Sequence, residues 1–429
     1  MGHTSMRRLS AVAALVITTG CGMLPGTASS GEPAEGPHRV AVEEPARSSG
    51  DGGRPAAVEH HWVGLHQAWQ VEQIDEEPMR YGLVSDGERF VALRQKIDGE
   101  GAAEVTGYDG ATGKRLWRKS LPWVGDSSPV AADGTIVVPL GRTHASSVDE
   151  PAQFAALDLA TGEERWRARV KSRVFMTSSL NLPAPDPGAI LDGVFYYADG
   201  PKLYGRDLAT GKIRYQRKSK SHKAVAGPLA AGDKLVVVVK PDLMVDTEGI
   251  DYGIDSLAVL NKKLTPVRQV DFPKDAAPDA VVTGGDIAVA YVAGGDDPRM
   301  WAIDTSTGKR LWDQPLGEYQ DPGPPLGDVL PIMDASVNHQ QQFVGRDLLT
   351  GKQLWKLGPR DAENVLDRGR AMGVADGTLF GLGHGVEIVD PETGKVTFRH
   401  QFTPRGGGLV TAAGGRIVIY NHDGLMGFD

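Results

Sequence analysis

The chain has 429 residues, 40% of them hydrophobic, and a formal net charge of −9. A chain of this size can bury a large core. Its 55 Gly and 28 Pro favour a fold full of tight turns over a helical one. No block of Lys and Arg follows the N-terminus, so a nucleic-acid partner is not expected, because phosphate binding needs clustered basic side chains.

The N-terminus has the pattern of a signal peptide. Arg7 and Arg8 precede an apolar run at 9–17, which is too short for a permanent membrane helix. The residues Thr-Thr-Gly-Cys that follow, ending at Cys21, resemble the bacterial lipobox, although Thr18 stands where that pattern prefers Leu. The resemblance implies that residues 1–20 are a lipoprotein signal peptide. It also implies that lipidated Cys21 anchors an exported domain to a membrane, outside the cytoplasm.

Cys21 is the only cysteine. Disulfides, cysteine metal sites and a cysteine nucleophile are therefore excluded from the folded domain. The alternative to lipidation is an ordinary secreted protein with an unpaired thiol, which is a liability in an oxidising compartment. After Cys21, residues up to 58 are rich in Gly, Pro, Ser, Ala and Glu, a composition that cannot offset the entropy of ordering. We therefore expect a flexible tether at 21–58 and the folded domain at 59–429.

Six segments of the folded domain share one pattern: Asp, two variable residues, Thr-Gly, three residues, then an aromatic. They are YDGATGKRLW (108–117), LDLATGEERW (157–166), RDLATGKIRY (206–215), IDTSTGKRLW (303–312), RDLLTGKQLW (346–355) and VDPETGKVTF (389–398). Successive Asp residues lie 43 to 49 positions apart, except between Asp207 and Asp304, where the interval is 97. A degenerate copy at 257–272, without the Thr-Gly and the aromatic, fills that gap. A period near 45 with strand-like composition is typical of a β-propeller.

Each copy has a simple physical interpretation. The Asp side chain can accept hydrogen bonds from backbone amides ahead of it, which favours a turn. Gly supplies the positive φ that closes the hairpin. We assign these structural turn roles to Asp109, Gly113, Asp158, Gly162, Asp207, Gly211, Asp304, Gly308, Asp347, Gly351, Asp390 and Gly394. Short strands such as 135–140, 234–239 and 286–292 lie between the copies, which gives the four strands of a propeller blade.

The two ends of the domain supply the last blade. Residues 424–429 resemble the strand that enters the repeat, with Asp429 at the Asp position, 39 residues after Asp390. Residues 66–73 resemble the strand that leaves it, with Trp69 at the aromatic position. The N-terminal strand should therefore pair with the C-terminal blade and close the ring, which removes free sheet edges. The predicted fold is all-β, an eight-bladed propeller.

The motif Asp-x-x-Thr-Gly-x-x-x-Trp resembles the tryptophan-docking repeat of PQQ-like (quinoprotein alcohol dehydrogenase-like) propellers, and the resemblance covers residues 62–429. It implies that the aromatic of each blade packs against the turn of the next. These structural docking residues are Trp69, Trp117, Trp166, Tyr215, Trp312, Trp355 and Phe398.

Two branches of this family imply different functions. Quinoprotein dehydrogenases hold PQQ and calcium, use an Asp base, and often carry an adjacent cysteine pair, which this chain lacks in the repeat region. The other branch comprises lipid-anchored, non-catalytic propellers similar to the outer-membrane assembly lipoprotein of the Bam complex. Lipobox, tether and blade number favour the second branch: a monomeric scaffold that docks an envelope protein, or a ligand-binding module. We then expect no catalytic residue, metal or cofactor; PQQ and calcium belong to the enzyme alternative.

Other candidate sites are weak. The acidic run 294–297 lacks the spaced ligands of a calcium loop. His60 and His61 have no identifiable third ligand, and the Gly-His-Gly at 383–385 has no phosphate-loop context. The segments 142–153, 173–192, 241–254 and 317–331 are longer than a hairpin needs. Because function is concentrated in long loops, they are candidate interaction surfaces.

Overall fold

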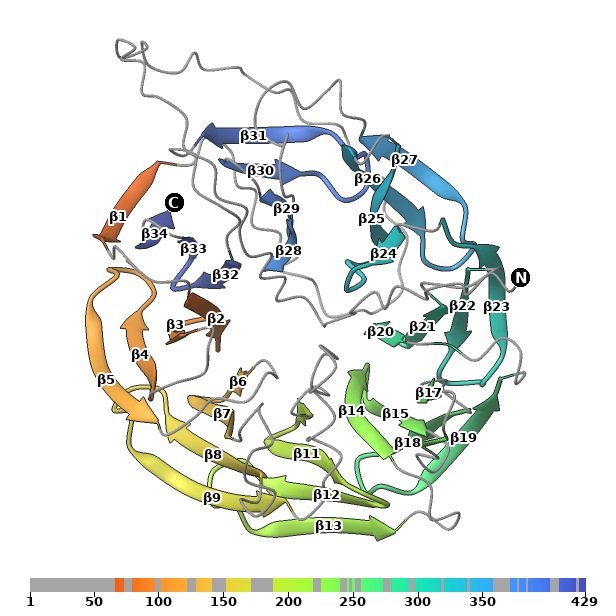
Figure 1. The fold of residues 1–429 in the computed structure, drawn as a ribbon, viewed down its shortest axis with the longest axis horizontal. Helices are drawn as coiled ribbons and strands as arrows, with labels where there is room; N and C mark the ends of the chain where they lie inside the picture. The colour runs from red at the N-terminus through yellow and green to blue at the C-terminus, as the bar shows by residue number, and fades with distance from the viewer. Residues whose placement is uncertain are drawn as a thin grey trace, which may run out of the picture.

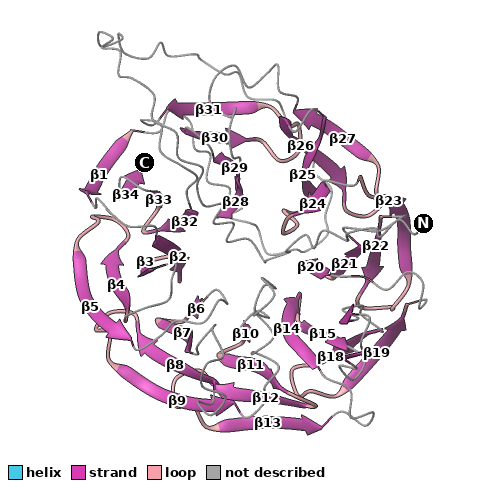
Figure 2. Ribbon diagram, in the orientation of Figure 1, coloured by secondary structure: helices cyan, strands magenta, loops and turns pink. Residues whose placement is uncertain are grey.

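The computed structural model describes residues 66–72, 79–96, 102–121, 129–140, 152–170, 188–218, 225–239, 245–246, 249–250, 256–272, 278, 280–292, 298–317, 320–337, 340–357, 371–375, 378–382, 385–401, 409–421 and 424–429. Regular secondary structure in these residues is entirely β-strand, as Figure 2 shows. Within them, no helix is long and apolar enough to span a bilayer.

The strands form eight four-stranded antiparallel sheets arranged around a common centre (Figure 1). Each sheet is a propeller blade whose strands run in chain order from the centre outward, except that the outermost strand of the eighth blade is the N-terminal strand of the chain. The first four blades are: first, β2 (Met79–Ser85), β3 (Arg89–Lys96), β4 (Ala103–Asp109), β5 (Arg115–Leu121); second, β6 (Val130–Ala132), β7 (Thr135–Leu140), β8 (Ala152–Asp158), β9 (Glu164–Val170); third, β10 (Ala189–Leu191), β11 (Val194–Asp199), β12 (Lys202–Asp207), β13 (Ile213–Lys218); fourth, β14 (Val225–Ala231), β15 (Lys234–Val239), β18 (Ser256–Leu260), β19 (Pro266–Asp271).

The remaining four blades repeat this arrangement, and a small hairpin lies within the fourth. They are: fifth, β20 (Ala280–Gly284), β21 (Ile287–Val292), β22 (Arg299–Asp304), β23 (Arg310–Pro315); sixth, β24 (Gln320–Pro322), β25 (Val329–Val337), β26 (Gln340–Asp347), β27 (Gln353–Leu357); seventh, β28 (Ala371–Ala375), β29 (Thr378–Leu382), β30 (Gly385–Val389), β31 (Val396–Gln401); eighth, β32 (Leu409–Ala413), β33 (Arg416–Asn421), β34 (Gly424–Phe428), β1 (Gln67–Glu72). The hairpin of the fourth blade is β16 (Val245–Asp246) with β17 (Gly249–Ile250).

The prediction of an all-β, eight-bladed propeller is confirmed, and so is the pairing of the N-terminal strand with the C-terminal blade. β1 pairs antiparallel with β34, and Trp69 lies opposite Gly427. The eighth blade also contacts the first: Phe90 and Tyr108 share a buried cluster with Val418, Tyr420 and Leu425. β1 thus covers the outer edge of β34, which would otherwise invite edge pairing.

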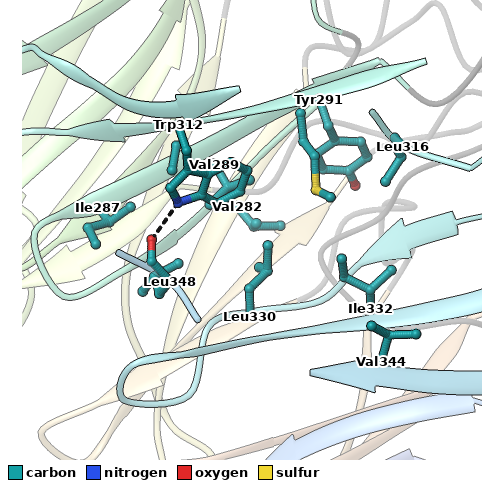
Figure 3. Packing of buried hydrophobic residues seen from close by; sticks show 12 residues of the cluster. Val282, Ile287, Val289, Tyr291, Trp312, Leu316, Leu330, Ile332, Val344 and Leu348 are labelled. Atoms are coloured by element: carbon teal, nitrogen blue, oxygen red, sulfur yellow. Dashed lines mark hydrogen bonds between the residues drawn. The ribbon is translucent and has the colours of Figure 1, made fainter. Parts of the chain in front are cut away.

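The core lies between neighbouring blades and follows from the strand pattern. Outer strands alternate, as in β9, where Trp166, Ala168 and Val170 are buried and the residues between them are exposed. Second strands are buried over most of their length, and β7 over all of it, because a blade in a ring has a neighbour on both faces. Figure 3 shows one such layer, in which Val289 of the fifth blade faces Leu330 of the sixth.

Two faces of the propeller can be distinguished by the connections they carry. One face holds the link between the first and second strands of each blade and the link between its third and fourth strands. We call it the turn face. These two turns touch: the amide of Leu159 donates to the Gly134 carbonyl (2.9 Å), and that of Leu348 to the Asp328 carbonyl (2.7 Å). All links on the turn face are short, for example 133–134 between β6 and β7.

The opposite face, which we call the loop face, carries the links between second and third strands and those between blades. The longest connections of the chain join strands there: 141–151, 171–188, 240–255 and 358–370. Residues 317–331 were expected to form one long loop, but they do not. They contain the innermost strand of the sixth blade, β24, and a turn-face link, since Gln320–Pro322 pair with β25.

Candidate functional site

The repeated turns are held by their own aspartates. In the first blade, Oδ1 of Asp109 accepts hydrogen bonds from the amide (2.9 Å) and the hydroxyl (2.6 Å) of Thr112. Asp207 and Thr210 repeat both bonds. Hydroxyl donors favour the ionised carboxylate, and the bond from Ser306 holds the pKa of Asp304 at about 2, below its ordinary value. These carboxylates are hydrogen-bonded within the turn, which is a structural role.

The turn glycines close the hairpin in the left-handed region, where other residues are strained. Their φ angles lie between 68° and 73° in Gly113, Gly162, Gly211, Gly308, Gly351 and Gly394. In each of these turns the amide of the glycine donates to the carbonyl of the motif Asp, and the amide of that Asp donates to the carbonyl of the residue after the glycine.

Four tryptophans each link their own blade to the following one by the same hydrogen bond. Each indole Nε1 donates to the carbonyl of the residue that follows the motif Asp in the next blade: Trp117 to Leu159 (2.8 Å), Trp166 to Leu208 (2.8 Å), Trp312 to Leu348 (2.9 Å) and Trp355 to Pro391 (2.6 Å). Figure 3 shows the bond of Trp312. The indole ring also lies against the turn glycine, and a Cβ on Gly351 would approach Cδ2 of Trp312 to 2.8 Å.

Trp69 of β1 makes the same ring contact with a turn glycine, but its indole Nε1 lies in a different environment. Its ring lies against Gly113 of the first blade and stacks on Phe90, with ring centroids 5.8 Å apart. Its buried Nε1 has no hydrogen-bond partner among the described residues. At this boundary the backbones meet directly instead, because the amide of Gly414 donates to the Gly87 carbonyl (2.8 Å).

The degenerate fourth blade has a turn one residue shorter than the others. The amide of Asn261 donates to the Thr265 carbonyl (2.9 Å), and Leu264, with φ 61°, takes the place of the glycine. Arg268 takes the place of the aromatic, since it pairs with Val259 as Trp312 pairs with Ala302. A Cβ on Gly308 would lie 3.5 Å from Cγ and Cδ of Arg268, so the aliphatic stem of an arginine covers that turn.

Tyr215 faces the turn of the fourth blade. It packs against a cluster that contains the buried Leu264. The carbonyl of Lys262, which follows Asn261, accepts its hydrogen bond from the hydroxyl of Tyr196 (2.8 Å) and not from an indole. Burial raises the pKa of Tyr196 to about 12, so this hydroxyl stays a donor even in alkaline solution. Phe398, the aromatic of the seventh blade, is half-buried and packs with Ile417 and Ile419 of the eighth.

Sequence reasoning missed the buried polar groups, among them the carboxylates of Glu387 and Asp334. Asp334 in β25 is 3% exposed and accepts hydrogen bonds from the amides of Gln320 (2.9 Å) and Gln342 (3.3 Å). Gln320 in turn accepts one from the amide of Gly317 at the end of the fifth blade (2.9 Å). The sequence contained one signal for this site: Asp334 continues the alternate positions of Leu330 and Ile332, which are buried in the strand. These bonds satisfy the buried carboxylate and fix the start of β24.

Few of the described side chains of the innermost strands could bind a cofactor. The described side chains there are mostly small or apolar, including Leu83, Ala131, Ile190, Leu229 and Val281. In the described part of the chain, no three His, Cys, Asp or Glu side chains converge as a metal site. Nothing in this arrangement identifies the several oxygen ligands that calcium requires.

The repeat geometry agrees with a comparison with protein families. The model of the family described as "Outer membrane protein assembly factor BamB" matches residues 101–191, 155–316, 255–364 and 342–429, which together cover 101–429. The chain belongs to this family. No curated protein matched the sequence.

Solved structures similar to this member of the BamB family share its propeller. The crystal structure of BamB from Moraxella catarrhalis is 17% identical over 85% of this chain and 97% of that one, with a TM-score of 0.52. The computationally designed Ika8 protein is 13% identical over 85% and 99%, with a TM-score of 0.57. The Dos1 propeller is 10% identical over 85% and 95%, with a TM-score of 0.55. At these identities the likeness concerns the fold.

Several predicted sites lie outside the described residues. They are Cys21, the tether 21–58, His60, His61 and the acidic run 294–297, together with most of segments 142–153, 173–192 and 241–254. The signal peptide and lipid anchor stay predictions.

Proposed function

We propose that this chain is an exported, non-catalytic propeller, held at a membrane through lipidated Cys21, that docks a protein partner of the cell envelope through its loop face. The observation that carries the proposal is the family match over residues 101–429, because the matching model is described as an assembly factor of the outer membrane. The lipobox-like sequence at 18–21 supports the anchor.

The two faces differ in what they can offer a partner. On the turn face, the motif aspartates and turn amides are used in bonds within each turn. On the loop face, strands are joined by the longest connections of the chain, and such connections are where binding residues are concentrated. Function is thus expected on the loop face.

The attachment point of the N-terminal segment supports the same assignment. His66 is bonded to Asp429 at the turn-face end of β34 (His66 N to Asp429 O, 2.9 Å), and β1 runs from there towards the loop face. The segment that leads back to Cys21 therefore joins the propeller on the turn face. The attachment point therefore does not occupy the loop face.

The test is site-specific photo-cross-linking in intact cells. A photoreactive residue at Lys202, the first residue of β12 at its loop-face end, is compared with one at Lys212 or Lys352, which are exposed on the turn face. We expect one dominant envelope protein to be captured from position 202, and a Cys21→Ala version to lose it. Equal capture from both faces contradicts the face assignment. Oxidation of an alcohol by the purified protein with added PQQ and calcium contradicts the non-catalytic assignment.

A further inference from the structure

The outermost strands of the first three blades are rich in basic residues. β5, β9 and β13 lie side by side along the rim of the ring (Figure 1) and hold nine cations and one acid. The acid is Glu164, and the cations are Arg115, Arg118, Lys119, Arg165, Arg167, Arg169, Arg214, Arg217 and Lys218. We call these three strands the basic rim. Their charge is opposite in sign to that of the whole chain, whose formal net charge is −9.

Protection of sheet edges does not explain the charge of the basic rim. Outermost strands present unpaired backbone groups, and cationic side chains are a common means of preventing edge-to-edge pairing. Every blade has such an edge, so this requirement should distribute cations evenly around the ring. The outermost strands of the fourth to sixth blades, β19, β23 and β27, hold only three cations and two acids: Arg268, Arg310, Lys356, Asp271 and Asp313. The excess in the first three blades therefore indicates a further role.

Carboxylates within the blades neutralise only part of the basic rim. Four of its cations form ion pairs: Arg118 with Glu104, Arg165 with Asp158, Arg167 with Glu164 and Arg214 with Asp207. The other five form no ion pair with a carboxylate in the described part of the chain; they are Arg115, Lys119, Arg169, Arg217 and Lys218. Of these five, Arg115, Arg169 and Lys218 are exposed, one on each strand. The basic rim thus presents positive charge to solvent along its whole arc.

Exposed apolar side chains lie among these cations. Leu116 of β5 is 39% exposed and Ile213 of β13 is 49% exposed. Leu311 and Leu354 are similarly exposed on the fifth and sixth blades, so the combination with excess cations is what distinguishes the first three. Cations mixed with exposed apolar groups are typical of surfaces that bind anionic membranes. Cations spread over three blades suit a partner with many mobile negative charges, because each lipid headgroup can move to its own cation.

We propose that the basic rim binds the anionic headgroups of a phospholipid membrane. The membrane attracts the rim and repels the net negative charge of the remaining chain, which orients the molecule. The propeller stands with this part of its rim on the bilayer, so the turn face and the loop face both stay accessible to a protein partner. This inference goes beyond the proposed function, because it requires neither the lipid anchor nor a docked partner.

Vesicle flotation tests the proposal with the full chain. The Cys21→Ala protein, which cannot carry a lipid on that residue, is mixed with vesicles of phosphatidylcholine alone or of phosphatidylcholine with phosphatidylglycerol. We expect binding only to the vesicles that contain phosphatidylglycerol, and loss of that binding at high salt, because salt screens the attraction between exposed charges. Absence of binding to the anionic vesicles overturns the proposal and leaves the proposed docking function standing.

Two variants of equal net charge locate the binding surface. The rim variant removes one exposed cation from each strand of the basic rim: Arg115→Gln, Arg169→Gln and Lys218→Gln. The control variant removes three exposed cations of the fifth and sixth blades: Lys309→Gln, Lys352→Gln and Lys356→Gln. Both should melt like the Cys21→Ala protein, because the substituted side chains are exposed.

The two variants should differ in their binding to anionic vesicles. We expect the rim variant to lower the partition coefficient by about tenfold or more, and the control variant by less than about twofold. Equal losses contradict the assignment to the rim. Equal affinity of the Cys21→Ala protein for soluble polyglutamate and for the anionic vesicles assigns the rim to an acidic protein and overturns the membrane proposal.

Discussion

His66 and Asp429 form a two-way backbone pair: the amide of His66 donates to the Asp429 carbonyl at 2.9 Å, and the amide of Asp429 donates to the His66 carbonyl at 3.1 Å. The second bond is equivalent to the one from Asp109 to Lys114 inside a continuous turn. Two segments far apart in the sequence therefore reproduce one motif, and the eighth blade depends on a strand from the other end of the chain.

Removal of β1 should destabilise the protein by more than the short length of this strand suggests. A protein that begins at residue 73 loses β1 and leaves β34 as an unpaired edge, whereas one that begins at residue 59 keeps β1. We expect the shorter protein to melt at a lower temperature and to associate through the open edge. Thermal unfolding and light scattering at several concentrations provide the measurement. Equal melting temperatures for the two proteins would show that β1 is dispensable.

Trp312 should contribute strongly to stability. It is 6% exposed, lies in the cluster between the fifth and sixth blades, and donates to the Leu348 carbonyl. Trp312→Ala is expected to cost about 3–5 kcal/mol, as for other buried aromatics, measured by urea unfolding. Its neighbour Leu311 is 38% exposed, so Leu311→Ala should cost well under about 1 kcal/mol. Similar costs for both would contradict the docking role of the indole.

Alanine substitutions at two glycines with the same φ angle can distinguish the cost of backbone strain from the cost of a steric clash. Gly351 and Gly415 both have φ 71°. A Cβ on Gly351 would meet Trp312 at 2.8 Å, whereas a Cβ on Gly415 meets nothing within 4 Å. Gly415→Ala should therefore pay only the left-handed penalty of roughly 1–2 kcal/mol. Gly351→Ala should cost clearly more, because the indole must move. The difference between the two free energies of unfolding is the quantity to measure.

The pair Tyr215–Leu264 should be exchangeable for the tryptophan–glycine pair only as a unit. Gly205 lies opposite Tyr215, as Gly107 lies opposite Trp117, but the ring of Tyr196 also lies against Gly205. Tyr215→Trp alone should clash with Leu264, and Leu264→Gly alone should leave a cavity, each costing about 1–3 kcal/mol. The double variant should recover part of both losses. A double-mutant cycle in urea that shows no coupling would sink this explanation.

Acid should weaken the turn of the fifth blade late in the titration. The pKa of Asp304 is lowered to about 2, chiefly by the hydroxyl of Ser306. A lowered folded-state pKa adds stability above the ordinary value of 3.8 and loses it as the pH falls towards 2. The stability gap between the native protein and Asp304→Asn should thus be widest near neutrality and shrink at pH 2. Urea unfolding midpoints near neutral pH and at pH 2 measure this gap. Glu163→Gln, at an exposed position, is the control variant. A gap that is constant with pH would contradict the assignment.

Most of the fold could be predicted from the sequence because its information is local and repeated. The spacing from Asp109 to Gly113 to Trp117 sets a turn and an outer strand by backbone chemistry alone, and its recurrence predicts the number of blades. The degenerate copy could be placed by its interval. Its substitute groups could not be predicted, because neither Leu264 nor Arg268 resembles the residue that it replaces.

The turn chemistry, the period and the pairing of the two ends could be predicted from the amino-acid sequence, since each depends on residues close to one another in the chain or on a count of repeats. The groups that meet across blades could be identified only in the folded molecule. Trp312 reaches the carbonyl of Leu348, Tyr196 that of Lys262, and Asp334 the amides of Gln320 and Gln342. Such contacts depend on how the blades are packed around the ring, which fixes distances between residues that no local pattern connects.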